Sequence, residues 1–595
     1  MTPAIARRGR HTPRPFTAPA AVLAALTLAV LVLVVGARLR ALRHDLALIG
    51  TELRDARGAL LAHDERRAAR ALDRAQARVV IGRDAAATPV VRLLRPLPVV
   101  GAIHAAADAS LTAAEEAVAA GWTVLAAASS LPTSGTTAID GLDLSLLHGA
   151  AARSADALGQ ASHRLRAAGV ALRGPSAALL PQVARPARAM RAEVERAHQQ
   201  IESARRGLAL LGELTADSSN TSMLVLAQDS LELRPTGGYI GSYGVLTFAE
   251  GRVTLETYAA TEDLPAPEPQ MTPPAELAPF LPEGWRLSNV NWSPDFPTTG
   301  AAAREMFRRQ GGGVVDGVLA LTDLAVARLT GALGPLAVPG YAEPVTEEGF
   351  SQRLVHEVEL KRPLDVPRKR FLIELAKVMI ARLFELPAEQ VPLVARAVDR
   401  SVSAGDIQLW FADERRQRQL RGTAVEGRLP APGHDVLAVV DANLSASKAN
   451  LGLSKHIRYR VSRDPAGGLL ARVTIVVENA APPSPVNPYY HGHLRVYAPQ
   501  HSRLLSVRPG QRAGPATEGP YEVFSQRVLV RPSSREEVTF DYALPPELAR
   551  TDDYELTWVR QPGTPRDVLE AAIDGDPVAA DTSHRTFRVR THSRR

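Results

Sequence analysis

The chain contains no cysteine and only five lysines among its 595 residues. The lack of cysteine excludes disulfides, thiolate metal sites and a cysteine nucleophile. Basic residues exceed acidic ones by a small margin, 70 against 63, so the composition does not indicate a nucleic-acid partner. The sequence also lacks a P-loop, a dinucleotide-binding fingerprint, a Gly-x-Ser-x-Gly elbow and a His-Glu-x-x-His motif. The enzyme classes that carry these motifs are therefore not indicated.

One long uncharged run is present, at residues 18–37. As a helix it would be about 30 Å long, which matches the hydrocarbon core of a bilayer. Four arginines and no acidic residue lie before it. This pattern predicts a transmembrane helix, a basic cytoplasmic stub over residues 1–17, and a single-pass protein of the cell membrane with the bulk of the chain extracytoplasmic. A cleaved signal peptide is the alternative, because residues 35–37 read Val-Gly-Ala and provide the small residues that a signal peptidase requires.

Three regions with different patterns follow. Residues 38–215 are rich in Ala, Leu, Arg and Glu at helical spacing and predict an α-helical stalk or bundle, with a partner-binding coiled coil as the alternative. Residues 220–445 alternate strand and helix patterns and predict a central α/β (α+β) domain. Residues 450–595 have period-two strands between Pro and Gly clusters and predict an antiparallel β-sandwich. The expected fold class is thus multi-domain.

The central region allows individual elements to be placed. Strands are expected at Met223–Gln228, Val245–Phe248, Arg252–Tyr258, Val314–Leu321 and Asp406–Phe411. Helices are expected at Thr298–Gln310, Asp323–Ala332, Glu347–Leu360, Pro367–Leu386 and Pro392–Ser401.

The segment between the first two of these strands is the most informative. Residues 231–242 read Leu-Glu-Leu-Arg-Pro-Thr-Gly-Gly-Tyr-Ile-Gly-Ser, so a buried strand leads into a turn and a second strand leaves it. Arg234, Thr236, Gly237 and Gly238 lie in that turn. Glycines permit close backbone approach, and an arginine beside them can bind a carboxylate or phosphate through its planar fork. A structural β-turn with Arg234 paired to an aspartate is the alternative.

Two further polar segments resemble motifs of a known family. Residues 289–297 read Asn-Val-Asn-Trp-Ser-Pro-Asp-Phe-Pro and contain Asn291, Trp292 and Asp295. Residues 441–448 read Asp-Ala-Asn-Leu-Ser-Ala-Ser-Lys and end at Lys448. With the turn and the Asp-Gly-Val at 316–318, these blocks resemble domain-of-unknown-function family 4012, a bacterial membrane-anchored family without an established activity. The resemblance runs from about residue 93 to Gly563. Trp292 is either a packing anchor or a platform for stacking a sugar.

The central region also has a weaker similarity to LytR-CpsA-Psr glycopolymer transferases. Residues 315–338 are similar to a strand, helix and strand of that family, and residues 364–371 look like its Asp-x-x-Arg helix start. Members transfer glycopolymers from a polyprenyl-pyrophosphate carrier to the cell wall, with arginines and Mg²⁺ at the pyrophosphate. The resemblance implies an anion site at Arg234, Arg368 and Arg370, with Mg²⁺ held by Asp295 or Asp229.

Other observations weaken that site. Residues 255–263, where the transferases carry a further arginine, read Leu-Glu-Thr-Tyr-Ala-Ala-Thr-Glu-Asp and contain none. Arg368 and Arg370 can equally be a solvated start of a helix. The sequence therefore leaves catalysis uncertain, and an enzyme would be a phosphotransferase of the LytR-CpsA-Psr type.

Two functional hypotheses remain. The first is an envelope protein that binds or transfers a lipid-linked phosphate glycan in cell-surface polysaccharide assembly, through Arg234, Thr236, Gly237, Gly238, Asn291, Asp295, Arg368, Arg370 and Lys448. The second is a non-catalytic structural or interaction module of the envelope. Convergence of Arg234, Arg368 and Asp295 in an open pocket would favour the first, and their burial in salt bridges would favour the second.

Overall fold

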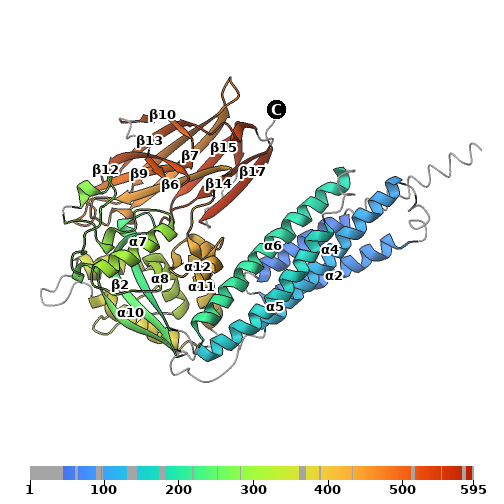
Figure 1. Ribbon diagram of the computed structural model, residues 1–595, viewed down its shortest axis with the longest axis horizontal. Helices are drawn as coiled ribbons and strands as arrows, with labels where there is room; N and C mark the ends of the chain where they lie inside the picture. Colours follow the sequence, from blue (N-terminus) through green and yellow to red (C-terminus); the bar gives the residue numbers. More distant parts are fainter. Residues whose placement is uncertain are drawn as a thin grey trace, which may run out of the picture. The chain divides into compact units, whose positions relative to one another are not determined.

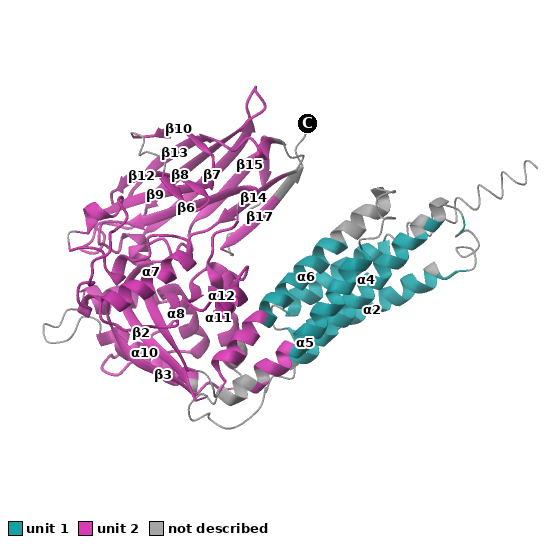
Figure 2. Ribbon diagram, in the orientation of Figure 1, with its two compact units in different colours: residues 1–131, 156–205 teal, residues 132–155, 206–595 magenta. Residues whose placement is uncertain are grey.

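The protein is described from a computed structural model. The residues it describes are 44–60, 64–88, 96, 98–129, 144–172, 181–216, 220–250, 252–281, 283–360, 370–387, 390–431, 433–510, 516–550, 553–578 and 585–592. The chain divides into two compact units: residues 1–131 with 156–205, and residues 132–155 with 206–595 (Figure 2). The predicted transmembrane segment 18–37 and the stub 1–17 lie outside the described residues.

The first unit is helical, as the sequence predicts for this region. Residues 44–60 form a helix, and longer helices follow: α2 (Glu65–Ala86), α4 (Pro98–Ser129), α5 (Leu144–Ala171) and α6 (Pro181–Leu214), the last two of which continue into the second unit. Alanine is frequent in their core, including Ala113, Ala114, Ala161 and Ala168, each fully buried. Because alanine fills little space, a cavity of about 700 Å³ remains among these helices.

No helix in the described part of the chain is both long and apolar enough to span a membrane. The long helices carry charged residues within their length. Even α4, which is rich in alanine, contains Asp108, Glu115 and Glu116. Charged side chains in the middle of a span are costly in a bilayer.

The second unit begins with a five-stranded sheet of order β3-β2-β1-β4-β5. Its strands are β1 (Asn220–Asp229), β2 (Tyr239–Ala249), β3 (Arg252–Ala260), β4 (Gly317–Thr322) and β5 (Ile407–Phe411). The pair β1–β4 is parallel, with Gln228 opposite Thr322, and the other pairs are antiparallel. The helices are α7 (Phe296–Arg309), α8 (Asp323–Leu333), α9 (Phe350–Leu354), the π-helix η6 (Val355–Leu360), α10 (Arg370–Phe384), α11 (Val391–Ala404) and α12 (Glu414–Leu420) (Figure 1). All ten elements expected in this region are present at shifted bounds.

The two faces of this sheet are covered differently. Alternate residues of β1 and β4, including Leu224, Leu226 and Val318, pack against Met306 and Phe307 of α7 and are fully buried. The residues between them face α8, α9 and α10, whose buried side chains form a separate cluster of their own. The period-two alternation thus gives each strand two apolar faces, as expected for a sheet between helical layers.

Two six-stranded sheets complete the second unit. Their orders are β10-β13-β8-β7-β15-β16 and β11-β12-β9-β6-β14-β17. The bounds are β6 (Asp435–Asn443), β7 (Leu453–Arg463), β8 (Leu469–Asn479), β9 (Tyr490–Pro499), β10 (Arg503–Arg508), β11 (Ala516–Glu518), β12 (Tyr521–Val530), β13 (Ser534–Ala543), β14 (Asp553–Val559), β15 (Val568–Ile573), β16 (Asp576–Val578) and β17 (Thr586–His592). Buried residues from both sheets, such as Tyr459, Val473 and Phe524, form one core between them.

The predicted fold class is wrong for the C-terminal β-sandwich. The sandwich is mixed and not antiparallel, because β14 pairs parallel to β6 and β15 pairs parallel to β7. Parallel pairing joins strands distant in the chain, and neither its direction nor its partner is written in a period-two pattern. Strand β6, within the range expected for the central domain, is a strand of the sandwich.

Candidate functional site

The turn at residues 231–238 is built by close backbone approach, as the sequence indicates. Strand β1 ends at Asp229, a single 3₁₀ turn (η2, Ser230–Glu232) follows, and β2 begins at Tyr239. Gly237 has a φ of +132°, a conformation that favours glycine. A Cβ on Gly238 would lie 2.2 Å from the carbonyl oxygen of Asp229, so the chain passes too close for any side chain. Both glycines thus have a structural role.

Arg234 is buried, with 6% of its surface exposed, and its guanidinium is held on several sides. Its Nε donates to Asn289 Oδ1 at 3.1 Å, and Nη1 donates to the carbonyl oxygens of Leu233 and Asn443. Its Nη2 forms an ion pair with Glu232 Oε1 at 3.2 Å. Asn443 belongs to the sandwich, so Arg234 links the α/β layer to the sheet beyond it. These partners make Arg234 a structural residue.

Thr236 and Asn291 are directed inward, onto one buried glutamine. Gln228 Oε1 accepts from Thr236 Oγ1 at 2.9 Å and from the backbone NH of Gly238 at 3.1 Å. Asn291 Nδ2 lies 3.1 Å from the same oxygen, 3.0 Å from Thr236 Oγ1 and 2.9 Å from the carbonyl oxygen of Gly238. All these polar groups are buried, so the arrangement fixes the turn.

Two more glutamines hold the outside of the turn. Gln408 Nε2, on β5, donates to the carbonyl oxygen of Thr236 at 3.0 Å. Gln561 Nε2 donates to the carbonyl oxygen of Arg234 at 3.1 Å and to that of Asp441 at 2.7 Å. Gln561 therefore joins the turn to β6.

Lys448 is the centre of a second charged cluster. Its Nζ lies 2.8 Å from Asp229 Oδ2, 3.3 Å from Glu232 Oε2 and 3.6 Å from Glu359 Oε1. Burial disfavours its charge, but Asp229 and Glu232 outweigh that effect, so the pKa of Lys448 is raised. The ammonium stays protonated and is surrounded by carboxylates.

Asp323 lies beside this cluster, at the first residue of α8. Asp229 is the last residue of β1 and Asp323 directly follows β4, so both lie at the carboxyl edge of this parallel pair. Asp323 is 6% exposed; its Oδ1 accepts from the backbone NH of Ser230 at 2.8 Å, while Oδ2 has no hydrogen-bond partner among the described residues. Burial, then repulsion from Asp229, raises the pKa of Asp323 to about 7, against the hydrogen bonds from Ser230.

A cavity of about 670 Å³ extends from these groups along the sheet. The volume lies within the roughly 300–1,000 Å³ typical of small-molecule sites. It separates the strands from the helices, and most of its lining is aliphatic or aromatic. Its apolar wall includes Val225, Leu319 and Leu321 from the strands, Val326 and Leu329 from α8, and Leu372, Leu375, Met379 and Leu383 from α10. Its ionisable lining consists of Asp229, Glu232, Arg234, Tyr239, Tyr258, Glu262, Asp323, Glu359 and Lys448.

The remaining predicted site residues do not extend this cluster. Asp295 is the N-cap of α7, where Oδ2 accepts from Thr298 and Oδ1 accepts from the backbone NH of Leu429 at 3.0 Å. Arg370 is exposed at the start of α10, and Arg368 lies outside the described residues. Asp229, the other magnesium candidate, is paired with Lys448. Among the described residues no group of three or more His, Asp or Glu side chains could hold a metal ion.

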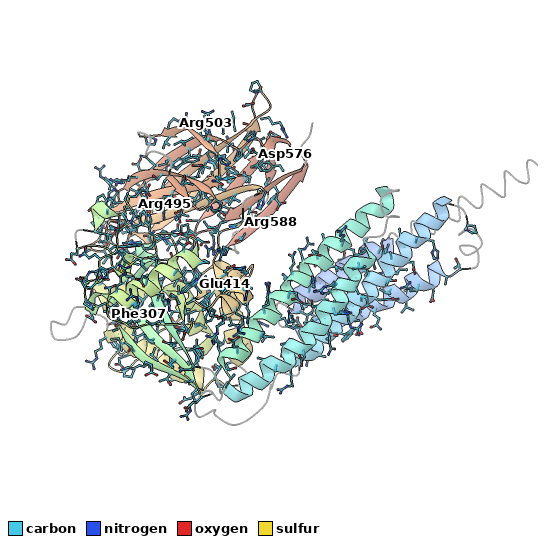
Figure 3. The ribbon with its side chains drawn as sticks, viewed as in Figure 1. Phe307, Glu414, Arg495, Arg503, Asp576 and Arg588 are labelled. Atoms are coloured by element: carbon cyan, nitrogen blue, oxygen red, sulfur yellow. The ribbon has the colours of Figure 1, made fainter. Side chains whose placement is uncertain are left out.

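Trp292 is an anchor for the sandwich. It is 6% exposed, and the Arg495 guanidinium from β9 lies 4.4 Å from its ring centre. His493 stacks on the same ring, with centres 5.7 Å apart. Figure 3 shows Arg495 on the sandwich strands and Phe307 in the layer of α7. The packing interpretation of Trp292 is therefore favoured over a sugar platform.

Asp229, Arg234 and Lys448 line the cavity and are candidates from the sequence, whereas Glu232, Asp323 and Glu359, which also line it, were not identified as site residues. Asp323 was only the first residue of an expected helix, and Glu359 the last turn of another. The available signal was a repeated pattern: in β1 and β4 an apolar run is followed by one polar residue, Gln228 or Thr322, and then by an aspartate. This pattern indicates a shared site only once the two strands are known to pair in parallel.

A family model matches the central part of the chain. Residues 219–358 match the family model described as a protein of unknown function, DUF4012. No curated protein and no solved structure matches the chain. The matched range runs from β1 into η6, and it contains the turn, Asp229, Arg234, Asn291, Asp295 and Asp323, but not Lys448 or α10. The resemblance to LytR-CpsA-Psr transferases stays a prediction, whereas the resemblance to the family of unknown function DUF4012 is confirmed for residues 219–358.

Proposed function

We propose that the second unit binds an amphiphilic molecule whose apolar chain occupies the cavity between the five-stranded sheet and helices α8–α10. The observation that carries this proposal is the cavity itself: about 670 Å³ of space with an apolar wall and a polar group of side chains at the carboxyl ends of β1 and β4. Sites for small molecules have this combination of an apolar lining and a few placed polar groups.

The way the sheet is covered supports this use. Face-to-face packing of a helical layer on a sheet normally leaves few voids larger than a water molecule. Here the buried residues of α8–α10, such as Phe350, Phe371 and Leu375, cluster with one another and apart from the strands. An apolar chain between the layers would bury the side chains on both, at about 25 cal/mol per Å² of apolar surface removed from water.

Binding is favoured over phosphoryl transfer. The arginine expected to hold a pyrophosphate, Arg234, is buried with Glu232 and donates to carbonyl oxygens of Leu233 and Asn443. Its hydrogen-bonding groups serve the junction of the two layers. This burial is the outcome expected for a non-catalytic module. We retain the expectation of a role in the bacterial envelope with a lipid-linked molecule as part of this proposal, because such a molecule includes a long apolar chain.

The proposal is tested by filling the cavity. Ala376 lies on α10 and lines it. We expect the full-length chain to bind 1-decanol in a calorimetric titration, and Ala376→Phe to weaken that binding at least tenfold, because the ring occupies the space of the chain. Ala301→Phe, at an exposed position of α7 on the opposite side of the sheet, is the matched control and should leave binding unchanged. Equal binding by the wild type and Ala376→Phe would contradict the proposal.

A further inference from the structure

We infer that Asp323 selects the polar head of the bound amphiphile, and that this head donates a hydrogen bond and carries no negative charge, as a hydroxyl or an ammonium group does. The inference rests on the proposed function and names the class of ligand. It departs from the phosphate ligand expected from the sequence.

Asp323 has a buried acceptor that no described residue uses. Asp323 lines the cavity, and only 6% of its surface is exposed. Its Oδ1 accepts a hydrogen bond from the backbone NH of Ser230. Its second oxygen, Oδ2, has no partner among the described residues. A buried carboxylate oxygen without a hydrogen bond is costly, and a ligand donor would remove that cost.

The ionisable groups around the cavity are mostly acidic. Five of its lining residues carry carboxyl groups: Asp229, Glu232, Glu262, Asp323 and Glu359. The basic groups among the described lining residues are Arg234 and Lys448, and both are already ion-paired, Arg234 with Glu232 and Lys448 with three carboxylates.

This distribution of charge disfavours an anionic head group. A phosphate would have to share these two cations with the carboxylates that already hold them, and it would face an excess of negative charge. A hydroxyl meets no such repulsion, and an ammonium is attracted. Burial and Asp229 raise the pKa of Asp323 to about 7, so at pH 8 this carboxyl is mostly ionised and acts as an acceptor.

The test compares three molecules with the same decyl chain: decylamine, 1-decanol and decyl phosphate. Each is titrated calorimetrically into the full-length chain at pH 8. We expect decylamine and 1-decanol to bind at least about tenfold more tightly than decyl phosphate. The ratio of decylamine to 1-decanol then separates a preference for positive charge from a preference for a neutral donor.

Asp323→Asn tests the residue itself. The side-chain oxygen of asparagine can still accept from the NH of Ser230, while its amide places a donor where Oδ2 was. We expect decylamine and 1-decanol to bind about tenfold more weakly to this variant, the effect of losing one hydrogen bond to a charged acceptor. Decyl phosphate should bind more tightly than to the wild type. Glu262→Gln removes a carboxyl group from the rim of the same cavity and should leave the ranking of the three molecules unchanged.

The outcomes separate the two proposals. Equal affinity for all three molecules, or tighter binding of decyl phosphate to the wild type, would overturn the inference and leave the proposed function standing. An identical change in Asp323→Asn and Glu262→Gln would also overturn it, because net charge and not the Asp323 acceptor would then decide. Absence of binding by all three molecules would overturn the proposed function, and the inference with it.

Discussion

The two faces of the five-stranded sheet are made by the same strands, yet only one of them is fully packed. On the α7 face, Leu224, Leu226 and Val318 are completely buried in one core with Phe307. On the other face, Val225, Leu319 and Leu321 line a cavity. The strands supply apolar side chains equally to both faces, so the difference comes from the helices that cover them. A face that keeps apolar walls without filling them is suited to hold a molecule from outside.

The largest effect on stability is expected from Arg234, which lines the polar end of the cavity. Arg234→Met would leave the Glu232 carboxylate without this partner and two carbonyl oxygens without their donor. Loss of one member of a buried pair costs about 3–5 kcal/mol. We expect the urea unfolding midpoint of the full chain to fall accordingly. Arg370→Met, at an exposed helix start, is the control and should change stability by less than about 0.5 kcal/mol. A stable Arg234→Met variant would return Arg234 to the list of ligand-binding candidates.

The comparison of faces is tested directly by one substitution made on each. Leu226→Ala removes a fully buried side chain from the packed face and should cost about 2–5 kcal/mol. Leu321→Ala removes a half-buried side chain from the wall of the cavity and should cost less, because its surroundings are already incompletely filled. Urea midpoints of the two variants provide the measurement. Equal losses would mean that the two faces are equally packed in solution.

Asp323, on the face of the sheet that lines the cavity, should make the stability of the protein depend on pH. Its pKa is raised from 3.8 to about 7, so between these values the native state holds a proton that the unfolded state has released. Stability from this group is therefore complete below about pH 4 and falls as the pH rises toward 7, by about 1.4 kcal/mol per pH unit over the steep part. Asp323→Asn should remove this decline from the thermal midpoint.

Asp435, in the sandwich, gives the matching control for that measurement. Burial raises its pKa to about 6 in spite of hydrogen bonds from Tyr459 and Tyr554. Its own decline with rising pH, which ends near pH 6, should persist in Asp323→Asn. If the wild type and Asp323→Asn have the same pH profile, the Asp323 carboxyl is not protonated at neutral pH.

The smallest effect is expected from two helix glycines. A Cβ on Gly300 of α7 would lie 2.8 Å from the Cβ of Trp410, so Gly300→Ala should destabilise the packed face. A Cβ on Gly331 of α8 would meet the carboxylate end of Glu347, which can move aside. Gly331→Ala should therefore be neutral or stabilise by up to about 1 kcal/mol through helix propensity. Differential scanning calorimetry of the two variants would decide, and a stabilising Gly300→Ala would show that α7 is loosely packed.

Local pattern was enough to place the elements of the central region. The helical spacing of residues 323–332 and the apolar run 223–228 each lie within an element that the structure contains, α8 and β1. The turn with Gly237 and Gly238 was also predicted, because positive φ and close approach are properties of a few adjacent residues. The role of Arg234 was predicted incompletely, since a structural pairing was foreseen but with an aspartate and not with Glu232.

What only the tertiary structure decided is which distant groups meet. Asn443 and Lys448 reach the turn from more than 200 residues away, and β6 pairs with β14 across more than 100 residues of chain. Periodicity specifies which face of an element is apolar, but it does not specify what covers that face or how completely. The cavity is a property of the space between layers. The Asp323 oxygen that accepts no hydrogen bond from the described residues likewise depends on the neighbours around it. Sequence alone therefore determined the strands, the helices and the turn, whereas the buried pairing of Arg234 and the open face of the sheet followed from packing over long distances in the chain.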